Sequence, residues 1–211
     1  MTDDKLPYHH GDLREVLVNR AIDQVEQDGL TKLSLRKIAA DVGVSHNAPY
    51  MHFANKDALL VAVVAEGFAL LRAAIAEAGG TEELRAEDWQ RHVKAGFAAY
   101  VHFARLRPRL YAFMHQPLGA APTQGDGTAD ALQQAGPAAL TRLAGTLATG
   151  QRLGLVRSGD PSAQALWVWA TLHGLAGLTG NARQSFGERT PDQVTDEVLD
   201  QLLDGLSTST S

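Results

Sequence analysis

Cysteine is absent from all 211 residues of the chain. The protein can therefore form no disulfide, no thiolate metal site and no cysteine nucleophile, which fits a reducing compartment. Eight histidines are present, but none has a His-Glu-x-x-His or comparable metal-binding spacing. A Gly-x-Ser-x-Gly elbow, a P-loop and a dinucleotide fingerprint are missing as well. We therefore expect no enzymatic activity, no cofactor and no metal site.

Uninterrupted apolar runs long enough to cross a bilayer are also lacking. Residues 1–7 carry two aspartates and a lysine without an apolar core, so they do not resemble a signal peptide. Even residues 166–178 are interrupted by His173 and two glycines. The sequence predicts a cytoplasmic protein without membrane contact.

Positive charge is scarce overall, because the formal net charge is −5. An acidic chain is a poor partner for phosphate unless cations gather locally. Residues 31–56 provide such a region, with four cations against one acid: Lys32, Arg36, Lys37 and Lys56 against Asp41. This local excess leaves nucleic-acid binding open.

Strand patterns are almost missing, whereas apolar residues recur at helical spacing nearly throughout, which predicts an all-α fold. Capping residues, glycines and prolines predict helices at 12–28, 35–42 after a Ser34 cap, 45–53 after a Ser45 cap, 56–78 after an Asn55 cap, 86–106, 110–115, 129–152, 161–181 and 191–206. Residues 116–128 are expected to be a mobile loop. We expect a small helical domain at 1–60, a larger helical domain at 61–206, and a disordered tail at 207–211, and the motifs below lead us to expect a helix-turn-helix in the first domain and effector binding and dimerisation in the second.

The segment 34–45 has the sequence pattern of a helix-turn-helix. An alanine lies where two helices touch, Gly43 lies at the turn, and Ser45 is placed to cap the next helix. The following helix should enter a major groove, where Asn47 could pair with adenine and Tyr50 could meet a thymine methyl or a phosphate. Lys56 could reach a backbone phosphate. The candidate DNA-binding residues are Ser34, Arg36, Lys37, Ser45, His46, Asn47, Tyr50, His52 and Lys56.

Residues 50–60, YMHFANKDALL, resemble the Y-x-H-F-x-x-K-x-x-L ending of TetR-family DNA-binding domains, and the likeness extends over about residues 12–60. The resemblance implies a dimeric all-α repressor that binds double-stranded operator DNA and a small molecule. Two positions depart from the family pattern. Pro49 replaces the usual leucine and should tighten the recognition helix, and Val42 replaces alanine before the turn glycine.

The C-terminal half resembles the Trp-x-x-x-His-Gly signature of one TetR subgroup at Trp169, His173 and Gly174. Trp169 and His173 are four residues apart and share one helix face. His173 could be the polar anchor of a ligand pocket or a satisfied core histidine. Aromatic residues at 97–115 suggest an apolar pocket, with Tyr100, His102, Tyr111, His115 and His173 as possible polar anchors. The predicted pocket residues are Phe97, Tyr100, Val101, Phe103, Tyr111, Met114, Trp169 and His173.

Gly174, Gly177 and Gly180 recur at every third position, which would permit close approach between helices. We expect helices 161–181 and 191–206 of two protomers to form a four-helix bundle at the dimer interface. The predicted interface residues are Gly174, Gly177, Val198 and Leu202. The alternative to an effector-released repressor is a DNA-binding adaptor without an effector. That adaptor would need no cavity between helix 86–106 and residues 129–180.

Overall fold

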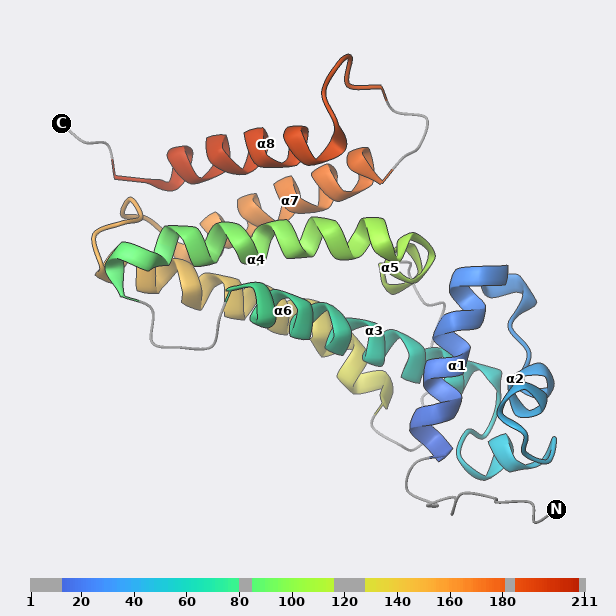
Figure 1. The fold of residues 1–211 in the computed structure, drawn as a ribbon. Coiled ribbons are helices and arrows are strands. Elements are labelled where there is room, and N and C mark those ends of the chain that lie inside the picture. The colour runs from blue at the N-terminus through green and yellow to red at the C-terminus, as the bar shows by residue number, and fades with distance from the viewer. Residues whose placement is uncertain (1–12, 80–84, 116–127, 181–184, 209–211) are drawn as a thin grey trace, which may run out of the picture.

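The N-terminal helices gather at one end of an elongated helical molecule (Figure 1). The computed structural model describes residues 13–79, 85–115, 128–180 and 185–208, with the backbone alone given for 128–135. The first elements are α1 (Leu13–Asp28), the 3-10 turn η1 (Leu30–Lys32), α2 (Leu35–Val42) and the 3-10 turn η2 (Ala48–Met51). The long helix α3 (Lys56–Gly79) leads from this end into the rest of the molecule.

Three local signals in the sequence produce the expected helix ends. The Ser34 hydroxyl accepts a hydrogen bond from the Lys37 amide and caps α2. Gly43 ends that helix with φ 78°, a left-handed conformation that favours glycine. The Asn55 side chain accepts from the Ala58 amide at 2.9 Å and caps α3. These predictions are confirmed.

The recognition segment is shorter and tighter than predicted. In place of a helix that begins at a Ser45 cap and ends near Phe53, the structure has η2 alone. The Ser45 backbone carbonyl, rather than its side chain, accepts from Ala48. Pro49 lies buried in the first turn of η2, where its missing N–H and fixed φ suit a tight turn. Pro49 was expected to tighten the recognition helix locally, and the structure has a 3-10 turn in place of the whole predicted helix.

The second half of the chain forms a bundle of α4 (Ala86–Leu106), α5 (Pro108–Met114), α6 (Thr128–Arg152), α7 (Pro161–Thr179) and α8 (Pro191–Leu206). Helix α4 lies centrally and packs against α3, α5, α7 and α8 (Figure 1). Asp160 caps α7, and Thr190 with Gln193 forms a capping box on α8. The all-α fold is confirmed for the described residues, while nearly all of the predicted loop at 116–128 lies outside them.

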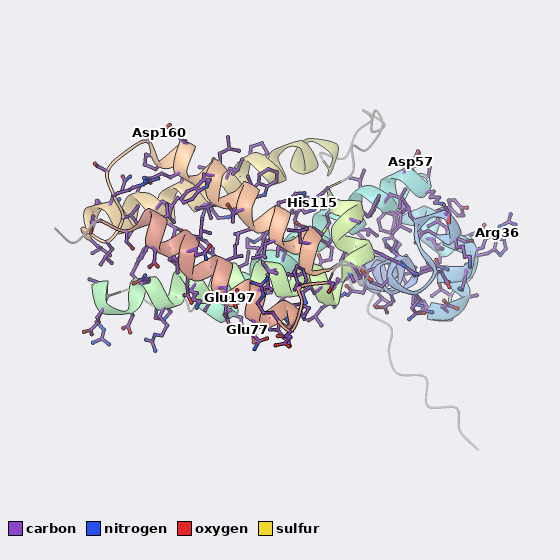
Figure 2. All side chains as sticks on the ribbon, turned by 90° about the horizontal axis from the view of Figure 1, so that it is seen from above. Arg36, Asp57, Glu77, His115, Asp160 and Glu197 are labelled. Carbon is purple, nitrogen blue, oxygen red and sulfur yellow. The ribbon has the colours of Figure 1, made fainter. Side chains whose placement is uncertain are left out.

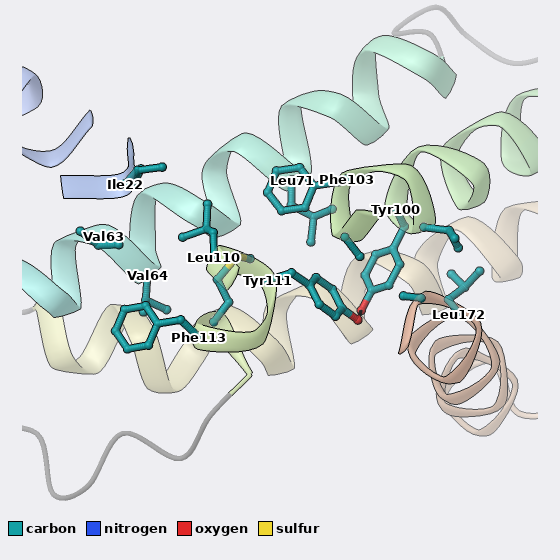
Figure 3. Packing of buried hydrophobic residues seen from close by; sticks show 14 of the residues in the cluster. Ile22, Val63, Val64, Leu71, Tyr100, Phe103, Leu110, Tyr111, Phe113 and Leu172 are labelled. Carbon is teal, nitrogen blue, oxygen red and sulfur yellow. Dashed lines mark hydrogen bonds between the residues drawn. The ribbon is translucent and has the colours of Figure 1, made fainter. Parts of the chain in front are cut away.

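Helix α3 corrects one expectation, because it is long and apolar enough by composition to cross a membrane. It nevertheless packs against α1, α4, α5 and α6, and buries Leu59, Val63, Val64 and Leu71. Figure 3 shows Val63, Val64 and Leu71 among the core side chains of its neighbours. A core helix of a folded domain has the same composition, so this helix is weak evidence for a membrane span.

The chain's end is ordered further than expected. Ser207 forms an isolated bridge with Val156, and the Arg157 amide donates to the Leu206 carbonyl at 2.8 Å. The Thr208 hydroxyl donates to the Gly154 carbonyl at 3.1 Å. A disordered tail starting at residue 207 is therefore wrong for Ser207 and Thr208, and residues 209–211 lie outside the described part of the chain.

Candidate DNA-binding surface and effector site

The recognition segment presents exposed side chains on both sides of the buried Pro49. Ser45, His46 and Asn47 are exposed, Tyr50 is 50% exposed and Met51 is 85% exposed. The segment is anchored from beneath by Pro49 and by Phe53, which is 2% exposed and lies under the Arg14 guanidinium at 5.3 Å. The structure thus holds a small surface of hydroxyl, imidazole, amide and apolar groups on a fixed base.

Cations around this surface differ in how free they are. Arg36 is exposed, makes no ion pair with the described residues, and projects from the end of the molecule opposite Asp160 (Figure 2). Lys37 instead donates to the Asp28 carboxylate at 2.6 Å, and this hydrogen bond lowers the pKa of Asp28 below its ordinary value. Lys37 is therefore partly neutralised as a phosphate contact.

The other predicted contacts have mixed placements. Ser34 is half-buried and its hydroxyl accepts the capping hydrogen bond of α2. His52 and Lys56 are half-buried beside the exposed segment. Met51 is exposed on the same surface but was not among the predicted DNA contacts. Its apolar side chain between two motif positions gave no sign in the sequence that it would be exposed.

Helix α1 fixes this surface as one unit. The Arg20 guanidinium donates to Asp41 of α2 at 2.7 and 3.0 Å. The Gln24 side chain accepts from the Ser34 amide at 3.2 Å, just before α2. Arg14 covers Phe53, which follows η2. A shift of α1 would therefore be passed to both parts of the helix-turn-helix.

The predicted effector site contains a chain of buried polar groups joining three helices. The hydroxyls of Tyr100 on α4 and Tyr111 on α5 share a hydrogen bond of 2.9 Å, and Figure 3 shows them directed at each other. The Tyr111 hydroxyl also meets Nδ1 of His173 on α7 at 2.7 Å. Trp169 stacks on His173 with ring centres 5.2 Å apart. His173 thus has both a polar partner and a packing partner.

His115 completes this group, which we call the aromatic–histidine cluster: Tyr100, Tyr111, His115, Trp169 and His173. The His115 ring lies 4.4 Å from that of Tyr111 and 4.9 Å from that of His173, between ring centres. Its Nδ1 is 2.9 Å from the Tyr111 carbonyl, which it meets as a donor in the fitting tautomer. His102, another candidate anchor, is exposed elsewhere on α4.

Burial favours the uncharged forms of three members of the cluster: Tyr100, Tyr111 and His115. Desolvation raises the pKa of both tyrosine hydroxyls above their ordinary value. It lowers the pKa of His115, and nearby His173 lowers it further. Helix α7 carries no Asp, Glu, Lys or Arg along its length. The site therefore offers hydroxyl and imidazole groups among aromatic rings, with no Asp, Glu, Lys or Arg on α7 beside them.

The remaining predicted pocket residues Phe97, Val101, Phe103 and Met114 are buried in the core. Met114 lies close against Gly67 of α3, where an added Cβ would approach its sulfur to 2.7 Å. A cavity of about 360 Å³ lies between α3 and α4, and one of about 140 Å³ at the far end of the bundle beside Trp89. The predicted pocket residue Phe103 and the candidate polar anchor His102 both line the larger cavity, and none of the predicted pocket residues lines the smaller one. The aromatic–histidine cluster packs its rings together rather than lining these two cavities.

The predicted dimer residues separate into two groups. Gly174 and Gly177 are exposed on α7, beside Leu166, Trp167 and Leu178, which are 54%, 41% and 51% exposed. Val198 on α8 is half-buried, whereas Leu202 is 3% exposed and lies in the core of its own chain. Leu202 is thus unavailable to a partner, contrary to the prediction.

Acid should destabilise the fold through His115. Because its folded-state pKa lies below the ordinary 6.5, the unfolded chain binds a proton that the folded chain does not as pH falls past that value. The free energy of unfolding should therefore decrease from about pH 6.5 toward the lower folded-state pKa. Urea unfolding between pH 7.5 and 5 should show a shallower decrease for His115→Gln than for the parent chain. Equal slopes would mean that His115 takes up its proton without cost to folding.

Comparison with known proteins identifies the class to which this arrangement belongs. Residues 17–63 match the family model for bacterial regulatory proteins of the tetR family, and residues 93–206 match the tetracyclin repressor-like C-terminal domain. A search of curated proteins gives no match. The chain is thus a helix-turn-helix DNA-binding regulator. It belongs to the TetR family.

Solved structures share the fold over nearly the whole chain. A protein of unknown function from Rhodococcus sp. RHA1 is 35% identical, covering 97% of this chain and 100% of its own, with a TM-score of 0.75. A putative TetR-family transcriptional regulator from Rhodococcus sp. is 20% identical, with coverage of 94% and 100% and a TM-score of 0.64. AibR in complex with isovaleryl coenzyme A and operator DNA is 16% identical, with coverage of 90% and 97% and a TM-score of 0.63. The last two show likeness of fold alone.

Proposed function

We propose that this chain is a homodimeric, cytoplasmic repressor that a small molecule releases from its operator. The observation that carries the proposal is the hydrogen-bonded chain of buried Tyr100 and Tyr111 and half-buried His173, which links α4, α5 and α7. Buried polar groups that converge among aromatic rings are typical of ligand sites. Residues 1–60 would then bind DNA, and residues 61–206 would bind the effector and the second protomer.

On DNA, the exposed segment 45–51 would enter the major groove. Asn47 has the amide geometry that pairs with adenine, while Tyr50 and Met51 offer surface to a thymine methyl. Lys56 and Arg36 would bind backbone phosphates and fix the register. Two protomers related by a twofold axis would read two half-sites of a near-palindrome.

The second protomer would cover the exposed apolar face of α7. This face comprises Leu166, Trp167, Ala170, Gly174, Gly177 and Leu178. The outward face of α8 is acidic, with Asp196, Glu197, Asp200 and Asp204 exposed. Lys94 pairs with Asp196 and Asp200, and Arg189 pairs with Glu197, so this face carries solvated charges that are costly to bury. The apolar face of α7 is therefore the better centre for a dimer, with α8 at its rim.

The effector is proposed to be small, largely apolar and uncharged. The cluster supplies hydroxyl and imidazole groups and contains no Lys or Arg to pair with a carboxylate or phosphate, and burial favours the uncharged form of His115. AibR, which has been crystallised with both a coenzyme A thioester and operator DNA, supports an effector-responsive fold of this type. A DNA-binding adaptor without an effector is the second candidate, favoured by the absence of the cluster from both cavities described above.

Effector binding would change the DNA-binding surface by moving α3. This helix begins at Lys56 beside the recognition segment and packs on α4 and α5. An effector must bind the DNA-incompetent spacing of the two protomers more tightly than the competent one. An effector that binds tightly without changing operator affinity would contradict this scheme.

Replacing Lys56 with alanine should weaken operator binding and reduce its dependence on salt. Loss of one phosphate contact lowers the slope of log affinity against log salt concentration by about 1. Tyr50→Ala should also weaken binding, with loss of sequence preference. The measurement is a salt titration with a duplex selected by the parent protein from a random library.

Arg72→Ala provides the matched control for Lys56→Ala. Arg72 is an exposed cation on the same helix, 16 residues and about 24 Å further from the DNA surface. This variant should keep the parent's salt slope. Equal slopes for Lys56→Ala and the parent, or loss of the dimer in either DNA-surface variant, would assign Tyr50 and Lys56 to structure instead.

A further inference from the structure

Helix α1 ends with the wrong charges for a helix C-terminus. Its last turn contains Glu26 and Asp28 and no basic residue, although the partial negative charge at this end favours cations. The Gly29 amide donates a hydrogen bond to the Val25 carbonyl at 3.0 Å. The carbonyls of Glu26 and Gln27, in the last turn of the helix, still need donors. A cationic donor from outside the helix would satisfy these carbonyls and oppose the partial negative charge.

Helix α5 begins with the opposite deficit. It has no acidic residue, and the side chain of Arg107 at its N-cap makes no capping hydrogen bond. Pro108 has no N–H to donate, and the Tyr111 amide donates to the Arg107 carbonyl at 2.8 Å. The Leu110 amide needs an acceptor, and a carboxylate is the best partner at this end.

Each helix end supplies what the other lacks. The Leu110 amide donates to Oε1 of Glu26 at 2.6 Å. Nη1 of Arg109 donates to the carbonyls of Glu26 and Gln27 at 2.9 and 2.5 Å. We call this contact the reciprocal cap. The residues that it joins are separated by 82 to 84 positions in the sequence.

The reciprocal cap and the aromatic–histidine cluster share one short helix. Tyr111 follows Leu110 directly, and α5 is seven residues long. Leu110 is fully buried, and Figure 3 shows it on the side of α5 toward Ile22 of α1, with Tyr111 reaching toward Tyr100. A shift of the α5 backbone at Tyr111 would therefore carry the Leu110 amide and Arg109 with it, because the three residues lie in one helical turn.

We propose that Glu26 and Arg109 are positioning residues, through which the state of the aromatic–histidine cluster sets the position of α1 and hence of the recognition segment. This route runs from α5 to α1, and from α1 through Asp41 and Phe53 to the helix-turn-helix. It is separate from the lever motion of α3. As regulation it rests on the proposed function, but the coupling belongs to the chain itself and can be measured without an effector.

The test is a double-mutant cycle on the full-length protein. Tyr111→Phe removes the hydroxyl from the cluster, and Glu26→Ala with Arg109→Ala removes the reciprocal cap. Amide hydrogen exchange at residues 25–29 is read in all four proteins. In the parent background, Tyr111→Phe should lower protection there about fivefold, the size expected for a buried hydrogen bond. Without the cap, the same substitution should change protection less than twofold.

Two further variants separate coupling from general damage. Glu26→Gln keeps a side-chain oxygen that can accept from the Leu110 amide, so the response to Tyr111→Phe should return in large part. Arg20→Ala breaks the α1–α2 ion pair without touching α5, and the full fivefold response should persist there.

Operator affinity, measured on a duplex selected from a random library, should follow the same cycle. Equal effects of Tyr111→Phe with and without the reciprocal cap would overturn the inference and leave α3 as the route. A Tyr111→Phe variant that changes neither exchange nor affinity would overturn it as well. Failure of the proposed function has a different signature, since the parent chain would then show no sequence-selective DNA binding.

Discussion

A Gly174→Arg variant is expected to be a folded monomer with weak operator binding. An added Cβ at Gly174 meets no atom within 4 Å in its own chain, so a single protomer can accept the side chain. In a dimer built on the α7 face, the arginine would lie in an apolar interface without a partner for its charge. Losing the second half-site should lower operator affinity by roughly 10²–10⁴-fold, because the linked sites no longer act together.

Sedimentation and thermal unfolding would establish this result. The control is Gly145→Arg, since Gly145 is also an exposed helical glycine with nothing within 4 Å, but lies on α6. It should remain a dimer with the parent's affinity. A dimeric Gly174→Arg protein would place the subunit interface away from α7.

The sequence predicted the helices well wherever a residue's own chemistry decides the boundary. Helix α4 and helix α8 have the predicted bounds, Ala86–Leu106 and Pro191–Leu206. Proline and capping residues act within one turn, so their effect is visible without knowledge of the fold. The restart after Arg107 was placed at Leu110, whereas α5 begins at Pro108, because proline is favoured in a first turn.

Contacts between distant parts of the chain were beyond the sequence. The apolar periodicity of α8 cannot distinguish a face buried in its own bundle from one kept for a partner, and Leu202 proved to be buried. Tyr111 and His173 were named as pocket residues, but their hydrogen bond depends on how α5 meets α7. The pairing of Glu26 with Arg109 and Leu110 gave no local signal at all.

The same limit applies to glycines, which look alike in sequence but face different surroundings. Gly150 on α6 is buried, and a Cβ there would lie 2.5 Å from Cζ2 of Trp89 and 2.6 Å from Cγ2 of Val156. Trp89 is 2% exposed, and its rigid ring could give way only toward the cavity of about 140 Å³ beside it. Gly150 is therefore the close-approach point between α6 and the start of α4.

Gly150→Ala should consequently destabilise the fold, although alanine is the better helix former. Overpacking of this kind costs about 1–3 kcal/mol, against a propensity gain of about 0.5–1 kcal/mol. Gly145→Ala on the same helix has open space and should receive the propensity gain alone. Thermal unfolding should thus move the two variants in opposite directions, by about 2–4 °C per kcal/mol for a chain of this size. If Gly150→Ala were as stable as Gly145→Ala, α4 and α6 would have to separate readily at this point, and the bundle's far end would be looser than its packing indicates.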